Sequence, residues 1–220
     1  MSVPDKYKTV LQPAEAEIIE KKSRFIAAAA PIASEEEAQA FVLAVRKKHY
    51  NANHTIYAFT AGLDREILRY SDDGEPSGTA GMPVLNILTG AALRNTVVVV
   101  TRYFGGTLLG TGGLARAYTA AAKDALLSAK TVEKNRYAVI EAEIDYALSG
   151  KFEYETARLG HFIKDTVYAA GVTYTILVEC GQAADFLAAV TELSGGSARA
   201  DVRREVFGTK NGANVTIDEE

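Results

Sequence analysis

Apolar runs in the first half of the chain predict a series of strands. Three open the chain, at residues 7–11, 14–21 and 24–32. A further pair, at residues 54–61 and 66–70, is joined by a short connection that contains Gly62. Residues 97–100 are all valine, which predicts a central strand buried on both faces.

Helical spacing of apolar residues interrupts these strands at three places. Ser34 and Glu37 form a capping box ahead of a helix that ends near Tyr50. A second helix is predicted over residues 79–90. A third begins near Leu114 and carries an apolar stripe at three-and-four spacing.

The second half of the chain alternates between the two periods in a recognisable order. Strands are predicted at residues 137–145, 165–169, 172–179 and 199–207, with helices from Ser149 and over residues 183–193. The order β-α-β-β-α-β is that of a ferredoxin-like domain. We therefore expect an α+β protein with an N-terminal domain at residues 1–132, a ferredoxin-like domain at 133–208 and a flexible tail at 209–220.

Glycines crowd the connection between the valine strand and the helix after it. They are Gly105, Gly106, Gly110, Gly112 and Gly113. Backbone N–H groups at the start of a helix meet the positive end of its dipole, so this loop is a candidate receptor for phosphate or another anion. The standard nucleotide-binding glycine patterns are absent. The other interpretation is that these glycines only allow strand and helix to pack closely.

An acidic turn precedes the valine strand and contains Asp72, Asp73, Glu75 and Ser77. Its Asp-Gly and Glu-Pro pairs are typical of a tight surface connection. The three carboxylates are also candidate ligands for Mg²⁺, which prefers few carboxylates and retains several waters. The favoured interpretation is that the chain holds no cofactor, with Mg²⁺ as the alternative.

Basic and aromatic residues follow the valine strand. Arg102 either pairs with Asp72 or Asp73, or binds an anion together with the glycine loop. Tyr103 and Phe104 either stack on nucleic-acid bases or close the core.

His54 and Tyr57 lie three residues apart in one predicted strand. Because successive side chains of a strand point to opposite faces, these two are expected on different faces of the sheet. His54 is either a hydrogen-bonded structural residue or a general base. No Ser, Cys or Lys is clearly paired with it, so the sequence predicts no catalytic residues.

Together these motifs resemble the signature of the YigZ/IMPACT family. The resemblance is carried by residues 72–81, Pro83, residues 102–106, Leu109-Gly110 and residues 112–114, with His54, Tyr57 and Ala58 ahead of them. The order of elements on either side is compatible with the two-domain bacterial members. The resemblance implies an N-terminal domain folded like the second domain of a small-subunit ribosomal protein, and a ferredoxin-like C-terminal domain similar to one in elongation factors. It also implies a role in control of translation through partner binding, without a catalytic mechanism.

Charge is distributed unevenly between the two predicted domains. Up to Glu133 there are fifteen basic and fourteen acidic residues, and beyond it nine and fourteen, so the halves carry +1 and −5. A general nucleic-acid binder shows a basic footprint. If RNA binds, we expect it at the first domain, around Arg102 and Arg116.

Three further features of the sequence predict where the protein resides. A single cysteine, Cys180, indicates a reducing compartment. The first residues lack a secretory pattern, and no apolar run approaches the length of a membrane span. We therefore expect a cytoplasmic protein with no membrane partner.

Three functions remain open at this point. The favoured one is a non-catalytic, translation-associated regulator that binds a protein or structured RNA through the surface from Asp72 to Leu114. The second is an Mg²⁺-dependent enzyme acting on a nucleotide or another phosphorylated ligand, with Arg102 neutralising charge. The third is a protein-interaction module that uses the open face of the C-terminal sheet.

Overall fold

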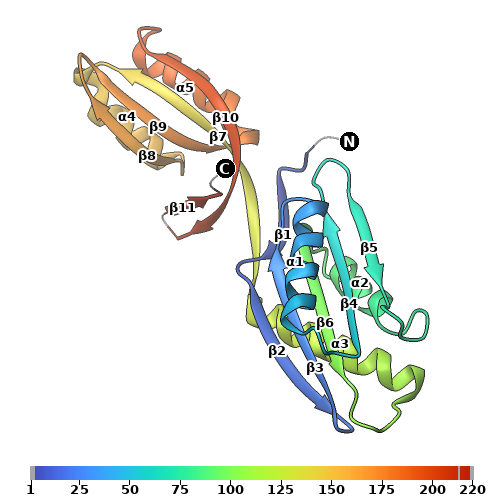
Figure 1. Cartoon of the computed structure of the whole chain (residues 1–220). Helices are drawn as coiled ribbons and strands as arrows, with labels where there is room; N and C mark the ends of the chain where they lie inside the picture. The colour runs from blue at the N-terminus through green and yellow to red at the C-terminus, as the bar shows by residue number, and fades with distance from the viewer. Residues whose placement is uncertain (1–2, 213, 219–220) are drawn as a thin grey trace. The chain divides into compact units, whose positions relative to one another are not determined.

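The computed structural model of the chain describes residues 3–212 and 214–218. The chain divides into two compact units, residues 1–133 and residues 134–220 (Figure 1). Both units mix helices and strands, which confirms the predicted α+β class. No helix among the described residues is long and apolar enough to cross a membrane.

The N-terminal unit is built on a five-stranded antiparallel sheet with the strand order β2-β3-β6-β4-β5. Its strands are β2 (Ala14–Glu20), β3 (Ser23–Pro31), β4 (His54–Ala61), β5 (Ile67–Ser71) and β6 (Thr96–Tyr103). The valine run lies in the central strand β6 and is completely buried, as its continuous apolar character predicts. The first strand, β1 (Lys6–Val10), pairs with β7 instead.

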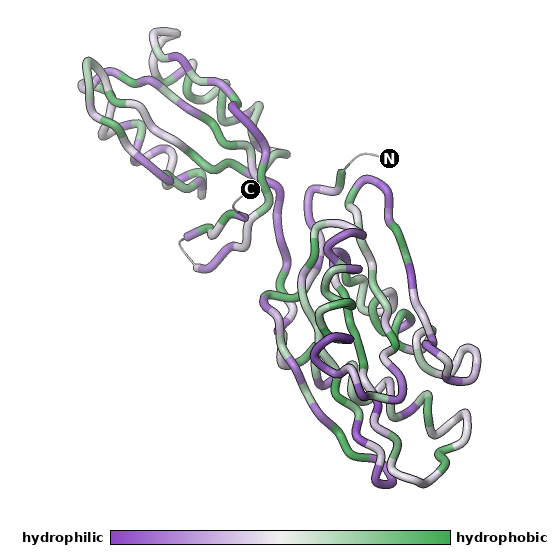
Figure 2. The backbone as a smooth tube through the Cα atoms, viewed as in Figure 1, coloured by the Kyte–Doolittle hydropathy of each residue, from purple (hydrophilic) through white to green (hydrophobic). Residues whose placement is uncertain are grey.

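Helices cover both faces of this sheet because its central strands carry apolar side chains on both faces. Helix α1 (Glu35–Lys48) packs on one face, against Val97 and Val99. Helices α2 (Gly81–Gly90) and α3 (Gly110–Ala129) pack on the other face, against Val98 and Val100 (Figure 1). Figure 2 shows hydrophobic colour along the central strands between these layers.

Two predicted helix boundaries in this unit are wrong. Helix α2 begins at Gly81, two residues later than expected. Helix α3 begins at Gly110 and not near Leu114, so its first turn contains three of the glycines that were assigned to a loop. Glycine is unfavourable in the interior of a helix. The N–H groups of the first turn have no partner within the helix, so glycine is tolerated at these positions.

The C-terminal unit has the strand and helix order of a ferredoxin-like domain. Its elements are β7 (Thr131–Ile144), α4 (Tyr146–Arg158), β8 (Phe162–Tyr168), β9 (Val172–Glu179), a 3₁₀ turn (Cys180–Gln182), α5 (Ala183–Ser194) and β10 (Arg199–Asn211). The strands are antiparallel in the order β10-β7-β9-β8. Phe152 of α4 and Phe186 of α5 pack on one face of this sheet, which confirms the predicted domain type.

The prediction of a flexible tail after Gly208 is wrong for the described residues. Strand β10 continues to Asn211, and β11 (Asn214–Ile217) pairs with it in antiparallel register. Val215 and Ile217 of β11 pack against a buried cluster that includes Tyr137 and Leu177, on the sheet face away from the helices. Strand β11 is ordered because its apolar side chains pack on this second apolar face of the sheet.

Candidate functional site

Strand β6 sends its last two side chains to opposite faces of the sheet. Arg102 pairs in register with His54 of β4 and Phe25 of β3. Tyr103 lies on the α1 face, where its hydroxyl is 3.0 Å from His49 Nδ1 and donates to Asn51. The alternation of strand residues therefore separates Tyr103 from Arg102, although they are adjacent in sequence.

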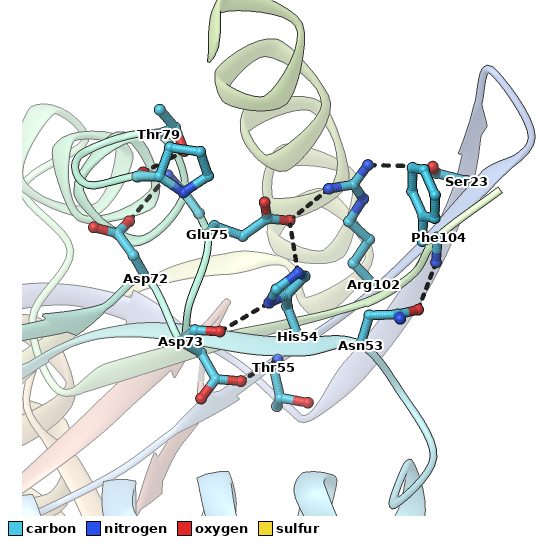
Figure 3. Close-up of polar contacts among 12 residues, drawn as sticks. Ser23, Asn53, His54, Thr55, Asp72, Asp73, Glu75, Thr79, Arg102 and Phe104 are labelled. Carbon is cyan, nitrogen blue, oxygen red and sulfur yellow. Dashed lines mark hydrogen bonds and ion pairs between the residues drawn. The ribbon is translucent and has the colours of Figure 1, made fainter. Parts of the chain in front are cut away.

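A buried ion pair lies on the α3 side of the sheet (Figure 3). Arg102 is only 5% exposed, and its NH1 donates to Glu75 Oε1 at 2.7 Å. Tyr118 of α3 donates its hydroxyl to the same oxygen at 2.7 Å. The sequence suggested Asp72 or Asp73 as partners for Arg102, but the structure pairs it with Glu75. Buried charges require such compensation, because an unpaired one is strongly disfavoured away from water.

The Arg102 guanidinium is held between two aromatic rings. Its central carbon lies 5.4 Å from the ring centroids of both Phe25 and Phe104, within the range of cation–π attraction. Its NH2 is 3.4 Å from the Ser23 hydroxyl, while its buried Nε has no hydrogen-bond partner among the described residues. Arg102 is therefore fixed in position with one donor still unused.

Tyr118 is held in its neutral form at this site. Burial, and next its hydrogen bond to Glu75, raise the pKa of the Tyr118 hydroxyl well above its usual value. A neutral phenol donates to the carboxylate at every physiological pH. Glu75 therefore keeps its oxygen shared between Tyr118 and Arg102.

His54 lies at the edge of this network. Its Nδ1 is 2.9 Å from the carbonyl oxygen of Asp73. Because a carbonyl only accepts hydrogen bonds, Nδ1 carries a proton, and Nε2 lies 3.9 Å from Glu75 Oε1. Tyr57 lies on the α1 face, stacked on Phe59, as strand alternation predicts.

Asp72 acts at the start of α2. One of its carboxylate oxygens accepts from the amides of Ala80 and Gly81, and the other accepts from Gly78. The side chain at the N-cap position, Ala80, makes no hydrogen bond to the helix. Asp72, which lies earlier in the sequence, therefore satisfies the free amides at the start of α2.

Asp73 faces yet another group of partners. Its carboxylate accepts from Arg46 of α1 at 2.8 Å and from the Thr55 amide at 2.6 Å. Ser77 is exposed in the same turn. The three carboxylates of the turn thus point to separate partners and do not fit a shared Mg²⁺ ion. Among the described residues no group of three or more His, Cys, Asp or Glu is placed to hold a metal.

The glycines after β6 serve different purposes. A Cβ on Gly105 would lie 2.0 Å from the backbone carbon of Lys22, so only glycine fits this close approach. Gly106 and Gly110 have positive φ angles of 82° and 71°. Gly112 and Gly113 lie inside the first turn of α3 and require no such angle.

The first turn of α3 has no capping side chain. Leu109 occupies the N-cap position without a side-chain hydrogen bond, and the turn contains no acidic residue. Arg116 is exposed in the second turn, and its NH1 would be 3.5 Å from a Cβ placed on Gly112. This end of α3 therefore presents the positive end of a 20-residue helix next to a cation.

A pocket of about 450 Å³ opens beside these groups, and we call it the α3 pocket. It is lined by Asn53, His54, Glu75, Pro76, Arg102, Phe104, Leu108, Leu109, Gly110, Thr111 and Leu114. The ion pair and the imidazole are the charged and titratable groups of its wall, and apolar side chains form most of the rest.

The α3 pocket brings together only part of the sequence-predicted site. His54, Glu75, Arg102 and Gly110 line it, whereas Tyr57 and Tyr103 lie on the other face of the sheet. Sequence reasoning missed Tyr118, Ser23, Asn53 and the two leucines of the rim. The hydroxyl of Tyr118 on a core-facing helix stripe was the available signal, since a buried tyrosine needs a hydrogen-bond partner.

Comparison with known proteins places the chain in a family. A model described as the Impact N-terminal domain matches residues 21–126, and a domain of unknown function, DUF1949, matches residues 143–197. The chain is 39% identical over 190 residues to IMPACT family member YvyE of Bacillus subtilis (strain 168), covering 86% of this chain and 88% of that protein. The chain belongs to the IMPACT family. This confirms the resemblance carried by the motifs between His54 and Leu114.

Other IMPACT family members agree. The chain is 37% identical over 179 residues to YigZ of Escherichia coli (strain K12), covering 80% of this chain and 88% of that one. A crystal structure described only as a hypothetical protein shares 33% identity with a TM-score of 0.61, covering 91% of this chain and 98% of the other. These similarities extend over both units of the IMPACT chain.

Proposed function

We propose that this IMPACT family member is a non-catalytic regulator in translation that binds a partner through the surface from Asp72 to Leu114. Membership of the family fits a translation-associated regulatory role. The observation that carries the binding site is the α3 pocket, where a fixed ion pair meets an apolar rim. Binding sites combine such apolar walls with a few placed polar groups. The partner is a protein or a structured RNA, and the single cysteine supports a cytoplasmic setting.

Two other functions have less support. An Mg²⁺-dependent enzyme needs carboxylates that face one ion, and Asp72, Asp73 and Glu75 face different partners. A partner site on the open face of the C-terminal sheet must compete with β11, whose Val215 and Ile217 pack on that face.

Co-purification tests the proposal. The tagged full chain is expressed in the organism from which it comes and is purified. Bound proteins are identified by mass spectrometry, and bound RNA by sequencing. Leu108→Asp is expected to lose a ribosomal or translation-factor partner, because it puts a charge at the pocket rim. Leu127→Asp is the matched control, since Leu127 is exposed at the far end of the same helix. Equal recovery with both variants would contradict a role for the pocket.

The enzyme alternative has its own test. Thermal unfolding is followed with a panel of nucleotides, with and without Mg²⁺. No Mg²⁺-dependent stabilisation is expected. A rise in melting temperature with one nucleotide, dependent on Mg²⁺, would favour the enzyme.

A further inference from the structure

The rim of the α3 pocket exposes apolar side chains to solvent. Leu108 lines the pocket and is 83% exposed. Phe104 is also exposed and lines the pocket, with its ring over the guanidinium of Arg102. Exposed apolar groups gathered around a hollow mark interaction sites more often than isolated ones do.

The rim of the α3 pocket also carries positive charge. The uncapped first turn of α3 supplies N–H groups at the positive end of its dipole. Arg116 follows one turn later and has no ion pair among residues 3–212 and 214–218. The acidic groups nearby already have partners: Asp72 accepts from the amides at the start of α2, and Asp73 and Glu75 are paired with arginines. The buried Arg102, which lines the pocket, keeps an unpartnered Nε.

These two properties favour a protein segment over RNA. Bases stack on aromatic faces and phosphates need several free cations. The rim offers one aromatic ring and mostly aliphatic side chains, because Tyr103 faces His49 on the other side of the sheet. Five arginines of this unit already form ion pairs: Arg24 with Glu17, Arg46 with Asp73, Arg69 with Glu35, Arg94 with Glu66 and Arg102 with Glu75. An aliphatic pocket beside one positive pole is better matched to a peptide.

We propose that the α3 pocket binds a short acidic and apolar peptide segment of a partner protein. A leucine-like side chain of the segment inserts between Leu108, Leu109 and Phe104. A carboxylate close to it in the segment receives hydrogen bonds from the first amides of α3 and pairs with Arg116. This assignment rests on the proposed function and names the class of its partner.

Panning a random 12-residue peptide library on the full chain tests the assignment. Peptides that also bind Leu108→Asp are removed. The expected consensus combines Leu, Ile, Met or Phe with Asp or Glu within a few positions. Enrichment of basic peptides, or of none above the Leu108→Asp background, would overturn the proposal.

The selected peptide is then synthesised with a fluorescent label, and its affinity is measured by polarisation. Leu108→Asp is expected to weaken binding by about tenfold or more, because the inserted side chain loses its apolar contact. Arg116→Glu is expected to weaken it by about fivefold, with a loss of salt dependence. Leu127→Asp and Lys123→Glu, exposed positions farther along α3, are the matched controls and are expected to bind normally. Equal losses in the controls would contradict the site.

A labelled single-stranded oligouridylate serves as the competing class of ligand. If it binds and Leu108→Asp or Arg116→Glu removes that binding while no peptide is selected, the site is for RNA and the peptide proposal fails. The outcome remains distinct from the proposed function. A translation partner that is lost from Leu108→Asp in cells would keep the regulatory role even if no acidic and apolar peptide were selected.

Discussion

The two units of the chain differ in what they bury. Among the described residues, ten buried polar or charged side chains belong to the N-terminal unit and one, Thr156, to the C-terminal unit. The charged ones are Glu75 and Arg102, which line the α3 pocket. Burial of charge opposes folding unless every group is compensated, so a fold does not acquire such a pair merely to be stable. This difference supports our proposal of a binding site in the N-terminal unit.

The largest expected effect on stability comes from removing the buried cation, Arg102. Arg102→Met keeps most of the side-chain volume but leaves Glu75 buried without its positive partner, which is expected to cost about 3–5 kcal/mol. Urea unfolding of the full chain measures the loss. Replacing Glu75 as well, in Arg102→Met with Glu75→Met, is expected to restore much of the stability.

Arg203→Met in the C-terminal unit is the matched control for Arg102→Met. Arg203 also pairs with a glutamate, Glu141, at 2.6 Å, but both side chains are solvent-exposed. Little change in unfolding is expected there. If Arg102→Met lowered the free energy of unfolding as little as Arg203→Met, the buried ion pair would not be important for stability. The two units would then not differ in this respect.

Glycine substitutions sharpen the comparison at the next level of effect. Gly105→Ala forces a Cβ against the Lys22 backbone and is expected to cost about 1–3 kcal/mol. Gly150→Ala, inside α4 of the other unit, meets no atom within 4 Å and is expected to stabilise by about 0.5–1 kcal/mol. Thermal unfolding of both variants checks the opposite signs. Equal effects would show that the close approach at Gly105 relaxes easily.

Two buried threonines give a smaller pair of effects. Thr156 has a buried hydroxyl without a partner among the described residues, so Thr156→Val is expected to stabilise by up to about 1 kcal/mol. Thr60 donates to the carbonyl of Leu93 at 2.9 Å, and Thr60→Val is expected to destabilise by about 1 kcal/mol. Denaturant midpoints at constant slope measure both. A loss of stability in Thr156→Val would reveal a hydrogen bond to water at that hydroxyl.

Acidification gives the smallest expected effect. Burial lowers the pKa of His161, which packs edge-on against Phe186, and Glu179 opposes this shift only in part. The unfolded chain therefore takes up a proton at a higher pH than the folded chain, and stability falls as the pH drops below about 6.5. Melting temperatures at pH 7.5 and 5.5 measure the slope, and His161→Phe is expected to reduce it. Burial lowers the pKa of His49 as well, so His49→Gln is expected to reduce the slope in the same direction from the N-terminal unit.

The sequence predicted the fold better than the site because the two depend on different information. The valine strand and the β-α-β-β-α-β order follow from local periodicity, and both are present. The partner of Arg102 was chosen wrongly because three carboxylates within one turn differ only in the direction that the folded turn gives them. Glu75 points to Tyr118, a residue 43 positions later, and no local pattern encodes that meeting.

Strand alternation also predicts opposite faces for Arg102 and Tyr103, so the expectation of one surface that contains both is wrong. Strand alternation was applied correctly to His54 and Tyr57 and gives the same answer for β6. Helix α3 began earlier than predicted because glycines were weighed by propensity and not by position in the first turn.

Strand β11 has a practical consequence for work with fragments of this protein. A version ended at Gly208, where the sequence pattern stops, would leave Tyr137 and Leu177 facing water on one side of the sheet. Such a fragment would expose this apolar surface to solvent, which promotes self-association. Apparent oligomers of that fragment would then report the position of the cut and not a property of the natural chain.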